Sequence, residues 1–316
     1  MGKKLFDGYN CFASALGQYF LNINMVKPIE SIIARWTFDF TRVRIFDNVW
    51  FVGACVEPTD YLLQHDLLNN EGIRVTTHKT NKDEARKVLS DELKRVGSHI
   101  IMVDNFYMKS INWERMERFG YFPKHLPHFI IIIAETETDI IYQDPFFQFE
   151  GKMSKQILEK ARCGTICNFD IDFEYYLVED IAIKSDQTTK EKLHGQLQRF
   201  LENGQLELIG EFGKALNDIK FKLEGKQDFN LALNTYTALE SVVKMRQSLA
   251  EILPKEKLIE KNAVKSLANK WSTLRKMFFN IYKKKDYSDI PNITETILQI
   301  REDEEEVVKN ILVGLV

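Results

Sequence analysis

The chain lacks the features that mark a membrane-spanning, secreted or nucleic-acid-binding protein. Its 43 Lys and Arg nearly balance its 46 Asp and Glu, and a net charge of −3 argues against general binding to nucleic acid. The longest apolar run, Phe129–Ala134, is far too short to cross a bilayer, and Met1–Asp7 has no apolar segment of the kind found in secretion signals. The 4 cysteines therefore point to free thiols in a reducing compartment. We expect a cytoplasmic protein with no nucleic-acid partner and no membrane partner.

Proline is also scarce, and its distribution divides the chain. Of the 7 prolines, the last two are Pro254 and Pro291, and the others all precede residue 185. A length of 316 residues with 44% hydrophobic and 28% charged residues suits two globular domains. We predict a mixed domain over 1–185 and a helical domain over 186–316, with the boundary region at Ile183–Thr188.

Short apolar runs between turn residues predict an α+β fold for the first domain. Asn81 followed by Glu84 is typical of a helix start, and Gly97 of a helix end. The runs 128–134 and 140–143 are joined by a short polar connection, which predicts a β-hairpin. The other predicted elements are helices at 11–21, 28–35, 58–69 and 83–96, strands at 49–54, 100–103 and 175–183, and a helix or long turn at 110–119.

Helical periodicity dominates the second domain. Five helices are expected, roughly at 187–203, 205–224, 228–253, 255–284 and 292–315, with glycine or proline at the joints. Because no fixed-period repeat is evident, a solenoid is not expected. The predicted architecture is an α+β domain followed by an all-α helical bundle.

The segment Gly8–Leu16 places a cysteine at the start of an apolar helix. A thiol in the first turn faces unpaired backbone N–H groups and the positive end of the helix dipole, and both favour the thiolate over the thiol. Cys11 is therefore a candidate nucleophile. Taken alone, a cysteine of this kind is more often a small buried apolar residue.

A histidine and an aspartate more than a hundred residues later change that interpretation. His128 opens one strand of the predicted hairpin, and Asp144 ends the other. Adjacent strands lie about 4.8 Å apart, so the carboxylate can accept a hydrogen bond from the imidazole. With Cys11 this makes a candidate catalytic triad, in which His128 is the base and Asp144 orients it. Each residue also has an ordinary interpretation, as a strand end or as part of an Asp-Pro turn.

At these residues the chain resembles papain-like cysteine enzymes. It is similar, more narrowly, to the family of the butirosin-biosynthesis protein H N-terminal domain, which shares its pattern with peptidase domains that process bacteriocin leader peptides. Cys11, His128 and Asp144–Pro145 match the family order, and Ser98–Tyr107 resembles its strand ending in an acidic and aromatic pair. The resemblance covers about residues 8–183.

The resemblance implies a cysteine-dependent acyltransferase of natural-product (secondary metabolite, antibiotic) biosynthesis. Such an enzyme moves an acyl group from a carrier-protein thioester to an amine. The implied partners are an acyl carrier protein or a peptidyl carrier domain, which brings the phosphopantetheine, and a small-molecule amine acceptor. No metal and no cofactor of the chain's own is implied.

Two departures from the papain-like pattern bear on the chemistry. Papain-like peptidases carry a glutamine several residues before the cysteine that helps to hold the oxyanion, whereas this chain has Lys4–Phe6 there. Losing one oxyanion donor typically costs about 10²–10³ in rate, which disfavours amide hydrolysis more than attack on an activated thioester. Cys11 is also followed by Phe-Ala-Ser instead of small residues. A thioesterase or cysteine peptidase of the same fold stays as an alternative, as does a non-catalytic binding or assembly protein with an inert Cys11.

Three further residues are candidates for substrate binding. Asn10 is the side-chain amide nearest to Cys11, Asp104 ends a buried strand and is also the second candidate for the orienting acid, and Phe146 follows Asp144 and can line an acyl pocket. A turn residue and a core aromatic are the ordinary interpretations of Asp104 and Phe146.

Two other patterns have both a functional and an ordinary interpretation. His125-x-x-His128 with Cys163-x-x-x-Cys167 has zinc-like spacing, but this reading removes His128 from the triad and is disfavoured. Residues 255–285 carry ten Lys or Arg against two Glu, which suits docking of an acidic carrier protein. The same residues can instead face the acidic run Glu302–Glu306 within the bundle, or be solvated.

Overall fold

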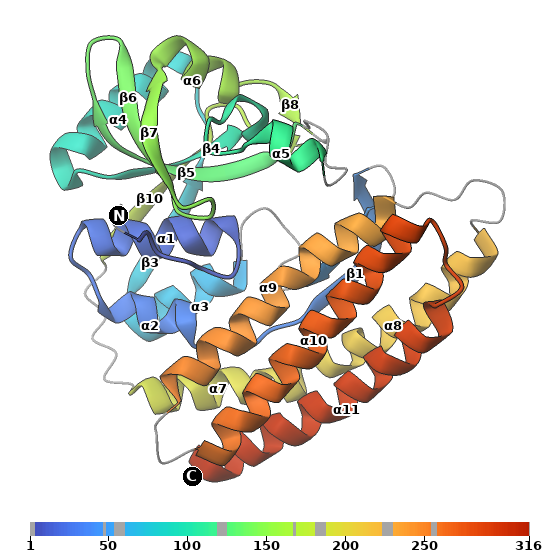
Figure 1. Cartoon of the computed structure of the whole chain (residues 1–316). Coiled ribbons are helices and arrows are strands. Elements are labelled where there is room, and N and C mark those ends of the chain that lie inside the picture. Colours follow the sequence, from blue (N-terminus) through green and yellow to red (C-terminus); the bar gives the residue numbers. More distant parts are fainter. Residues whose placement is uncertain are drawn as a thin grey trace. The chain divides into compact units, whose positions relative to one another are not determined.

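The computed structural model describes residues 4–46, 49–53, 61–118, 125–166, 169–180, 188–222, 230–253 and 258–315. The chain forms two compact units, the first made of Met1–Ile32 with Pro58–Ser185 and the second of Ile33–Glu57 with Asp186–Val316. The first unit contains a six-stranded antiparallel sheet and the second is dominated by long helices (Figure 1). The fold is therefore a mixture of α and β structure with helices in the C-terminal part.

The break between the units at Ser185 falls where composition changes, but residues 33–57 belong to the second unit and not to the predicted first domain. The physical reason is packing. The ring of Phe38 stacks on Trp271 at 5.5 Å, and Phe40 lies 5.4 Å from Phe212. Arg246 donates to the carbonyl oxygen of Thr37 at 2.9 Å. These contacts join residues about 170 or more positions apart, which local sequence patterns do not reveal.

The sheet of the first unit has the strand order β3-β10-β4-β5-β6-β7, and every pair in it is antiparallel. The hairpin predicted from the sequence forms its β5–β6 pair, while strands β3 and β7 and helix α6 were not predicted. The strands are β3 Ile73–His78, β4 His99–Asp104, β5 Pro127–Glu135, β6 Asp139–Asp144, β7 Phe149–Ser154 and β10 Tyr175–Asp180.

Helices cover both faces of this sheet because its central strands alternate apolar side chains on both sides. On one face Phe12 of helix α1 (Cys11–Asn22) packs against Phe129 and Tyr176, with ring centroids 5.0 and 5.4 Å away. On the other face Ile130 and its neighbours share a core with residues of helices α4 (Lys82–Val96) and α6 (Lys155–Ala161). The sheet therefore holds the start of α1 near the ends of its strands.

The remaining short elements of the first unit connect these layers. Helix α4 has the predicted ends: the Asn81 side chain accepts from Asp83 N and Glu84 N, and Gly97 follows with φ of 75°. The other elements are α2 Lys27–Ile33, α3 Tyr61–Glu71, the 3₁₀ turn η1 Asn105–Tyr107, α5 Trp113–Glu117, β8 Thr165–Ile166 and β9 Phe169–Asp170.

The second unit contains five long helices and a two-stranded hairpin. The helices lie close to the predicted ranges, because each presents a regular apolar stripe to one shared core. Within the described ranges no helix is long and apolar enough to cross a membrane. The elements are β1 Asp39–Phe46, β2 Val49–Gly53, α7 Thr189–Glu202, α8 Gln205–Lys222, α9 Asn230–Ile252, α10 Leu258–Lys284 and α11 Ile290–Leu315.

A buried ion pair lies in the core of the second unit. Arg246 Nε lies 3.0 Å from Glu304 Oε1, and neither side chain is exposed. Trp271 Nε1 also donates to Glu304 at 2.7 Å, and the Arg246 guanidinium lies 4.6 Å from the centroid of the Trp36 ring. One residue of the acidic run 302–306 is thus a core residue and not a surface charge.

Candidate active site

Helix α1 begins at Cys11, as predicted, because Asn10 caps it. Asn10 has an extended backbone, and its side-chain oxygen accepts a hydrogen bond from Ala13 N at 2.7 Å. The backbone N–H of Cys11, as the first helical residue, has no acceptor within the helix. The side chain of Cys11 is half-buried and the thiol is free, so it is partly accessible.

The segment leading to Cys11 is held by side chains of the same unit. Leu5 N donates to Gln148 at 3.1 Å, and Phe6 N donates to Gln18 at 2.8 Å. Gly8 N donates to Ser14 Oγ at 3.0 Å, and a Cβ at Gly8 would lie 2.5 Å from Ser14 N. Only glycine fits this close approach of two backbones, so Gly8 positions the turn before the thiol.

The predicted histidine–aspartate pair is present. His128 Nε2 lies 2.9 Å from Asp144 Oδ2, and both residues are buried, Asp144 completely. The β5–β6 pairing ends at Ile131 and Gln143, so the two strands separate before they reach these side chains. The separation leaves room for the imidazole to meet the carboxylate at the end of the sheet.

Cys11 lies within hydrogen-bonding reach of the same imidazole. Burial alone would lower the pKa of His128, but the charge and hydrogen bond of Asp144, and then Cys11, raise it to about 10. His128 is therefore an imidazolium at neutral pH. Because Nε2 faces Asp144, Nδ1 is the nitrogen left for the sulfur. The structure thus brings the three predicted catalytic residues together.

Asp144 has two further partners. Ser110 Oγ donates to Asp144 Oδ2 at 2.5 Å, and Phe147 N donates to Oδ1 at 3.3 Å. Burial and then the charge of Asp144 raise the pKa of Tyr142 to about 12. Sequence reasoning missed Ser110, because nothing near it in the chain indicates that it meets a strand 34 residues away.

Two aromatic rings pack around the imidazole. The ring centroid of His128 lies 6.2 Å from that of Phe146 and 5.4 Å from that of Phe147. Phe146 is half-buried, so part of its surface stays open beside the site. Phe146 thus lies beside one of the candidate catalytic residues, and its role in acyl binding stays a prediction.

Asp104 does not orient His128. Its Oδ2 lies 2.5 Å from Nδ1 of His125, and its Oδ1 accepts from Phe106 N at 3.0 Å. Asp104 pairs with Pro127 across the β4–β5 ladder, whereas Val103 pairs with His128. Since side chains alternate along a strand, the Asp104 carboxylate points away from the face that carries His128. The second candidate for the orienting acid therefore forms a separate pair.

The two histidines of the zinc-like pattern are engaged with two different carboxylates. Cys163 is exposed, while Cys167 lies outside the described residues, as does Cys55. Among the residues that the structure describes, no group of three or more His, Cys, Asp or Glu is arranged to hold a metal ion.

The basic segment 255–285 coincides with helix α10 from residue 258 onward. Lys270 binds Asp303 of α11, Lys265 lies 3.3 Å from Glu251, and Arg275 lies 3.0 Å from Glu240. Several of its charges therefore have partners within the bundle. Docking of an acidic partner on this helix stays a prediction.

Comparison with known proteins adds no family to this geometry. A scan against protein-family models and a search of curated proteins found no match to the chain. The chemistry available to the site follows from its own residues: the half-buried thiol of Cys11 contacts the imidazolium of His128, which contacts the buried carboxylate of Asp144. This arrangement suits attack by sulfur on a carbonyl carbon.

Proposed function

We propose that the protein is a papain-like cysteine acyltransferase that moves an acyl group from a carrier-protein thioester to an amine acceptor. The observation that supports it most directly is the contact of Cys11 with His128 together with the bond from His128 to Asp144. The six-stranded antiparallel sheet with a helix that begins at the cysteine is compatible with this fold. The proposed setting is cytoplasmic natural-product biosynthesis.

The first half-reaction acylates the enzyme. The Cys11 thiolate attacks the thioester carbonyl, and the C–S bond to the pantetheine breaks. His128, an imidazolium at neutral pH, gives its proton to the departing pantetheine sulfur. Asp144 holds the ring with its Nε2 fixed, so the other nitrogen stays directed at the reacting atoms.

The second half-reaction transfers the acyl group. The amine attacks the Cys11 thioester, neutral His128 removes the proton from the amine nitrogen, and the Cys11 thiolate is released. The backbone N–H of Cys11 is the donor that we assign to the oxyanion in both steps. One backbone donor without the upstream glutamine suits an activated thioester better than a peptide bond, which favours transfer over proteolysis.

Two parts of the chain take supporting roles in this proposal. Phe146 beside His128 is proposed to contact the acyl chain. Helix α10 is proposed to contact an acidic carrier protein through those of its Lys and Arg residues that face solvent, such as Lys276. The carrier brings the phosphopantetheine, so the enzyme needs no cofactor of its own.

Intact-protein mass spectrometry after exposure to a panel of acyl-pantetheine thioesters tests the proposal. The expected result is a single acyl adduct on Cys11, absent in Cys11→Ser and formed slowly in His128→Ala. Addition of small amines should then discharge the adduct faster than water does. A folded protein that forms no adduct with any acyl group would contradict acyl transfer and also a thioesterase.

A further inference from the structure

A pocket lies in the first unit, away from Cys11. It has a volume of about 800 Å³ and is walled by α4, α6 and the turn between β5 and β6. His128 lies at one end of β5 and Glu135 at the other, so at about 3.3 Å per residue the pocket is roughly 20 Å from the triad. Its lining therefore plays no part in the chemistry described above.

Arg162 lines this pocket and is an unusual residue to find there. Its side chain is buried, with 3% of the residue exposed. One guanidinium nitrogen donates to the carbonyl oxygens of Phe173 and Glu174 at 3.0 and 3.4 Å, and Nε is buried without a hydrogen-bond partner. Burial lowers the pKa of Arg162 to about 10, which leaves it a cation at neutral pH.

No carboxylate among the described residues forms an ion pair with Arg162, whose described partners are two neutral carbonyls and the face of the Phe173 ring. A buried cation without a counter-charge is costly because it has lost the water that solvated it. A protein that keeps such a cation at the wall of a pocket has a place for an anion, because an anion in the pocket supplies the missing counter-charge.

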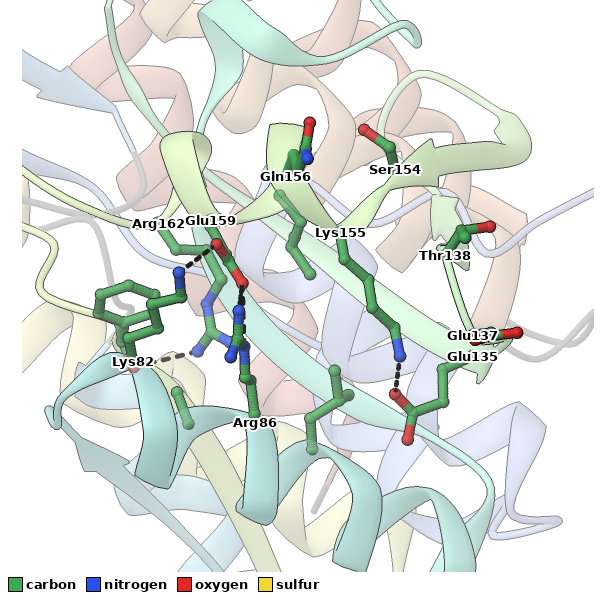
Figure 2. Close-up of a pocket in the computed structure, with 14 residues that line it drawn as sticks. Lys82, Arg86, Glu135, Glu137, Thr138, Ser154, Lys155, Gln156, Glu159 and Arg162 are labelled. Carbon is green, nitrogen blue, oxygen red and sulfur yellow. Dashed lines mark hydrogen bonds and ion pairs between the residues drawn. The ribbon is translucent and has the colours of Figure 1, made fainter.

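Other cations converge on the same pocket (Figure 2). Lys82 and Arg86 extend from α4 to one carboxylate, that of Glu159, with Lys82 Nζ 2.6 Å from it. Lys155 lies 2.9 Å from Glu135 on the opposite side. Burial opposes ionisation of Glu159, but the hydrogen bonds from Lys82 and Arg86 outweigh it and lower its pKa. Glu159 thus occupies a position that an incoming anion would take.

The pocket also has an apolar wall. Leu89 of α4 and Leu158 of α6 are buried and line it together with Phe173. A cationic end beside apolar side chains matches a ligand with an anionic head and a short apolar body. Inorganic anions alone would leave the apolar wall unused.

We propose that this pocket binds a small organic oxyanion, a carboxylate or phosphate ester with a short apolar body, with the anionic group between Arg162, Lys82 and Arg86. Binding of the anion displaces the carboxylate of Glu159 from Lys82 and Arg86 of α4. The site is separate from the triad, and its occupation does not depend on the proposed acyl transfer.

Isothermal titration calorimetry on the full chain tests this with hexanoate and hexyl phosphate as probes and hexanol as the uncharged control. Saturable binding is expected for at least one of the two anions, and the one that binds identifies the head group. Hexanol should not bind. If neither anion binds saturably, or hexanol binds as tightly as the better anion, the proposal is wrong.

Variants locate the site. Arg86→Gln should weaken binding about tenfold, because one charge-assisted hydrogen bond contributes about 1.5 kcal/mol. Lys87→Gln is the matched control, since Lys87 is the exposed next residue of α4 and does not line the pocket. It should bind like the wild type.

Glu159→Gln should change the affinity for the anion in the opposite direction. Removing the competing carboxylate frees Lys82 and Arg86, so the anion should bind about tenfold more tightly. Arg86 is exposed and Glu159 is half-buried, so Arg86→Gln and Glu159→Gln should both fold. Equal affinity of Arg86→Gln, Glu159→Gln and the wild type would overturn the proposal.

Discussion

Two histidine–aspartate pairs lie close together in the chain, and they differ in burial. In the pair of His128 with Asp144 both side chains are buried, at 6% and 0% exposure, whereas the side chain of His125 beside Asp104 is 56% exposed. His128 is in contact with the Cys11 thiol, and His125 stacks on Phe106 with ring centroids 4.4 Å apart. Identical residue types thus form a fully buried pair in one case, and in the other a pair whose aspartate is buried, with 5% of its side chain exposed, and whose histidine is open to solvent.

The difference shows what a protein must add to an imidazole and a carboxylate to make a reactive group. Burial strengthens the electrostatic interaction between the two because little water screens it. It also requires that each polar atom find a partner, and Asp144 meets that requirement with Ser110 and Phe147 N. On this account, changes to the pair of His128 with Asp144 alter the reactivity of Cys11, and matched changes to the pair of His125 with Asp104 do not.

The largest difference between the two pairs is expected when each histidine is replaced by alanine. His128→Ala removes the proton carrier, so acylation of Cys11 should slow by about 10²–10⁴-fold. His125→Ala should leave the rate within about twofold. Single-turnover acylation followed by mass spectrometry measures both. Equal losses in the two variants would mean that the buried pair has no special role.

Replacement of the two aspartates tests stability and its pH dependence. Asp144→Asn leaves the buried His128 without its counter-charge, which should cost about 3–5 kcal/mol in the free energy of unfolding near pH 6. The charge of His125 is open to solvent although Asp104 is buried, so His125 depends less on its carboxylate than His128 does, and Asp104→Asn should cost less than Asp144→Asn.

The sign of the pH effect follows from the raised pKa of His128. A group whose folded-state pKa lies above its unfolded value stabilises the fold fully below the unfolded value, about 6.5 for histidine. That stabilisation is lost as pH rises through about 10. The difference in the free energy of unfolding between wild type and Asp144→Asn, measured with urea, should therefore shrink from pH 6 to pH 10. A difference that stays constant over this range would contradict an ion pair between His128 and Asp144.

Removal of the Ser110 hydroxyl should have a smaller effect. Ser110→Ala deletes a hydrogen bond to a charged group, which contributes about 1.5 kcal/mol, so acylation should slow by about tenfold. Because Ser110 acts by positioning Asp144, the pH–rate profile should shift as well. Ser110→Thr keeps the hydroxyl and should recover most of the rate. A profile identical to wild type in Ser110→Ala would show that the bond is merely structural.

The smallest effect is expected beside His125. Phe106→Leu removes the ring that stacks on His125, which should cost about 0.5–1.5 kcal/mol of stability. Cys11 should react at the wild-type rate. Thermal unfolding and the acylation assay together check this. A marked loss of acylation rate would mean that the pair of His125 with Asp104 contributes to the site.

Local signals in the sequence were sufficient for the elements that build the site. The apolar run that begins after Cys11 predicted helix α1, although not its Asn10 cap, and two apolar runs with a polar connection predicted the β5–β6 hairpin. The hairpin places His128 and Asp144 near one another, whereas Cys11 reaches them through the packing of α1 on the sheet, where Phe12 contacts Phe129 and Tyr176. The helices of the second unit were predictable for the same reason, because their apolar stripes are long and regular.

The rest depended on contacts between distant residues. Strand β3 lies at an edge of the sheet and has a weak pattern, and its partner β10 is about 100 residues away. The assignment of residues 33–57 to the second unit depends on Arg246 and the aromatic core there. Ser110 and the partner of Asp104 were likewise hidden, since a side chain's partner across a sheet is not encoded in nearby residues.

The relative rate at which Cys11 and Cys163 react with iodoacetamide, followed peptide by peptide, tests the central claim most directly. Both are free cysteines within the part of the chain that the structure describes, and the exposed Cys163 serves as an internal standard for the half-buried Cys11. If His128 activates Cys11, Cys11 should be alkylated faster than Cys163 at pH 6, and this advantage should disappear in His128→Ala. Slower modification of Cys11 than of Cys163 at every pH from 5 to 9 would contradict a poised nucleophile.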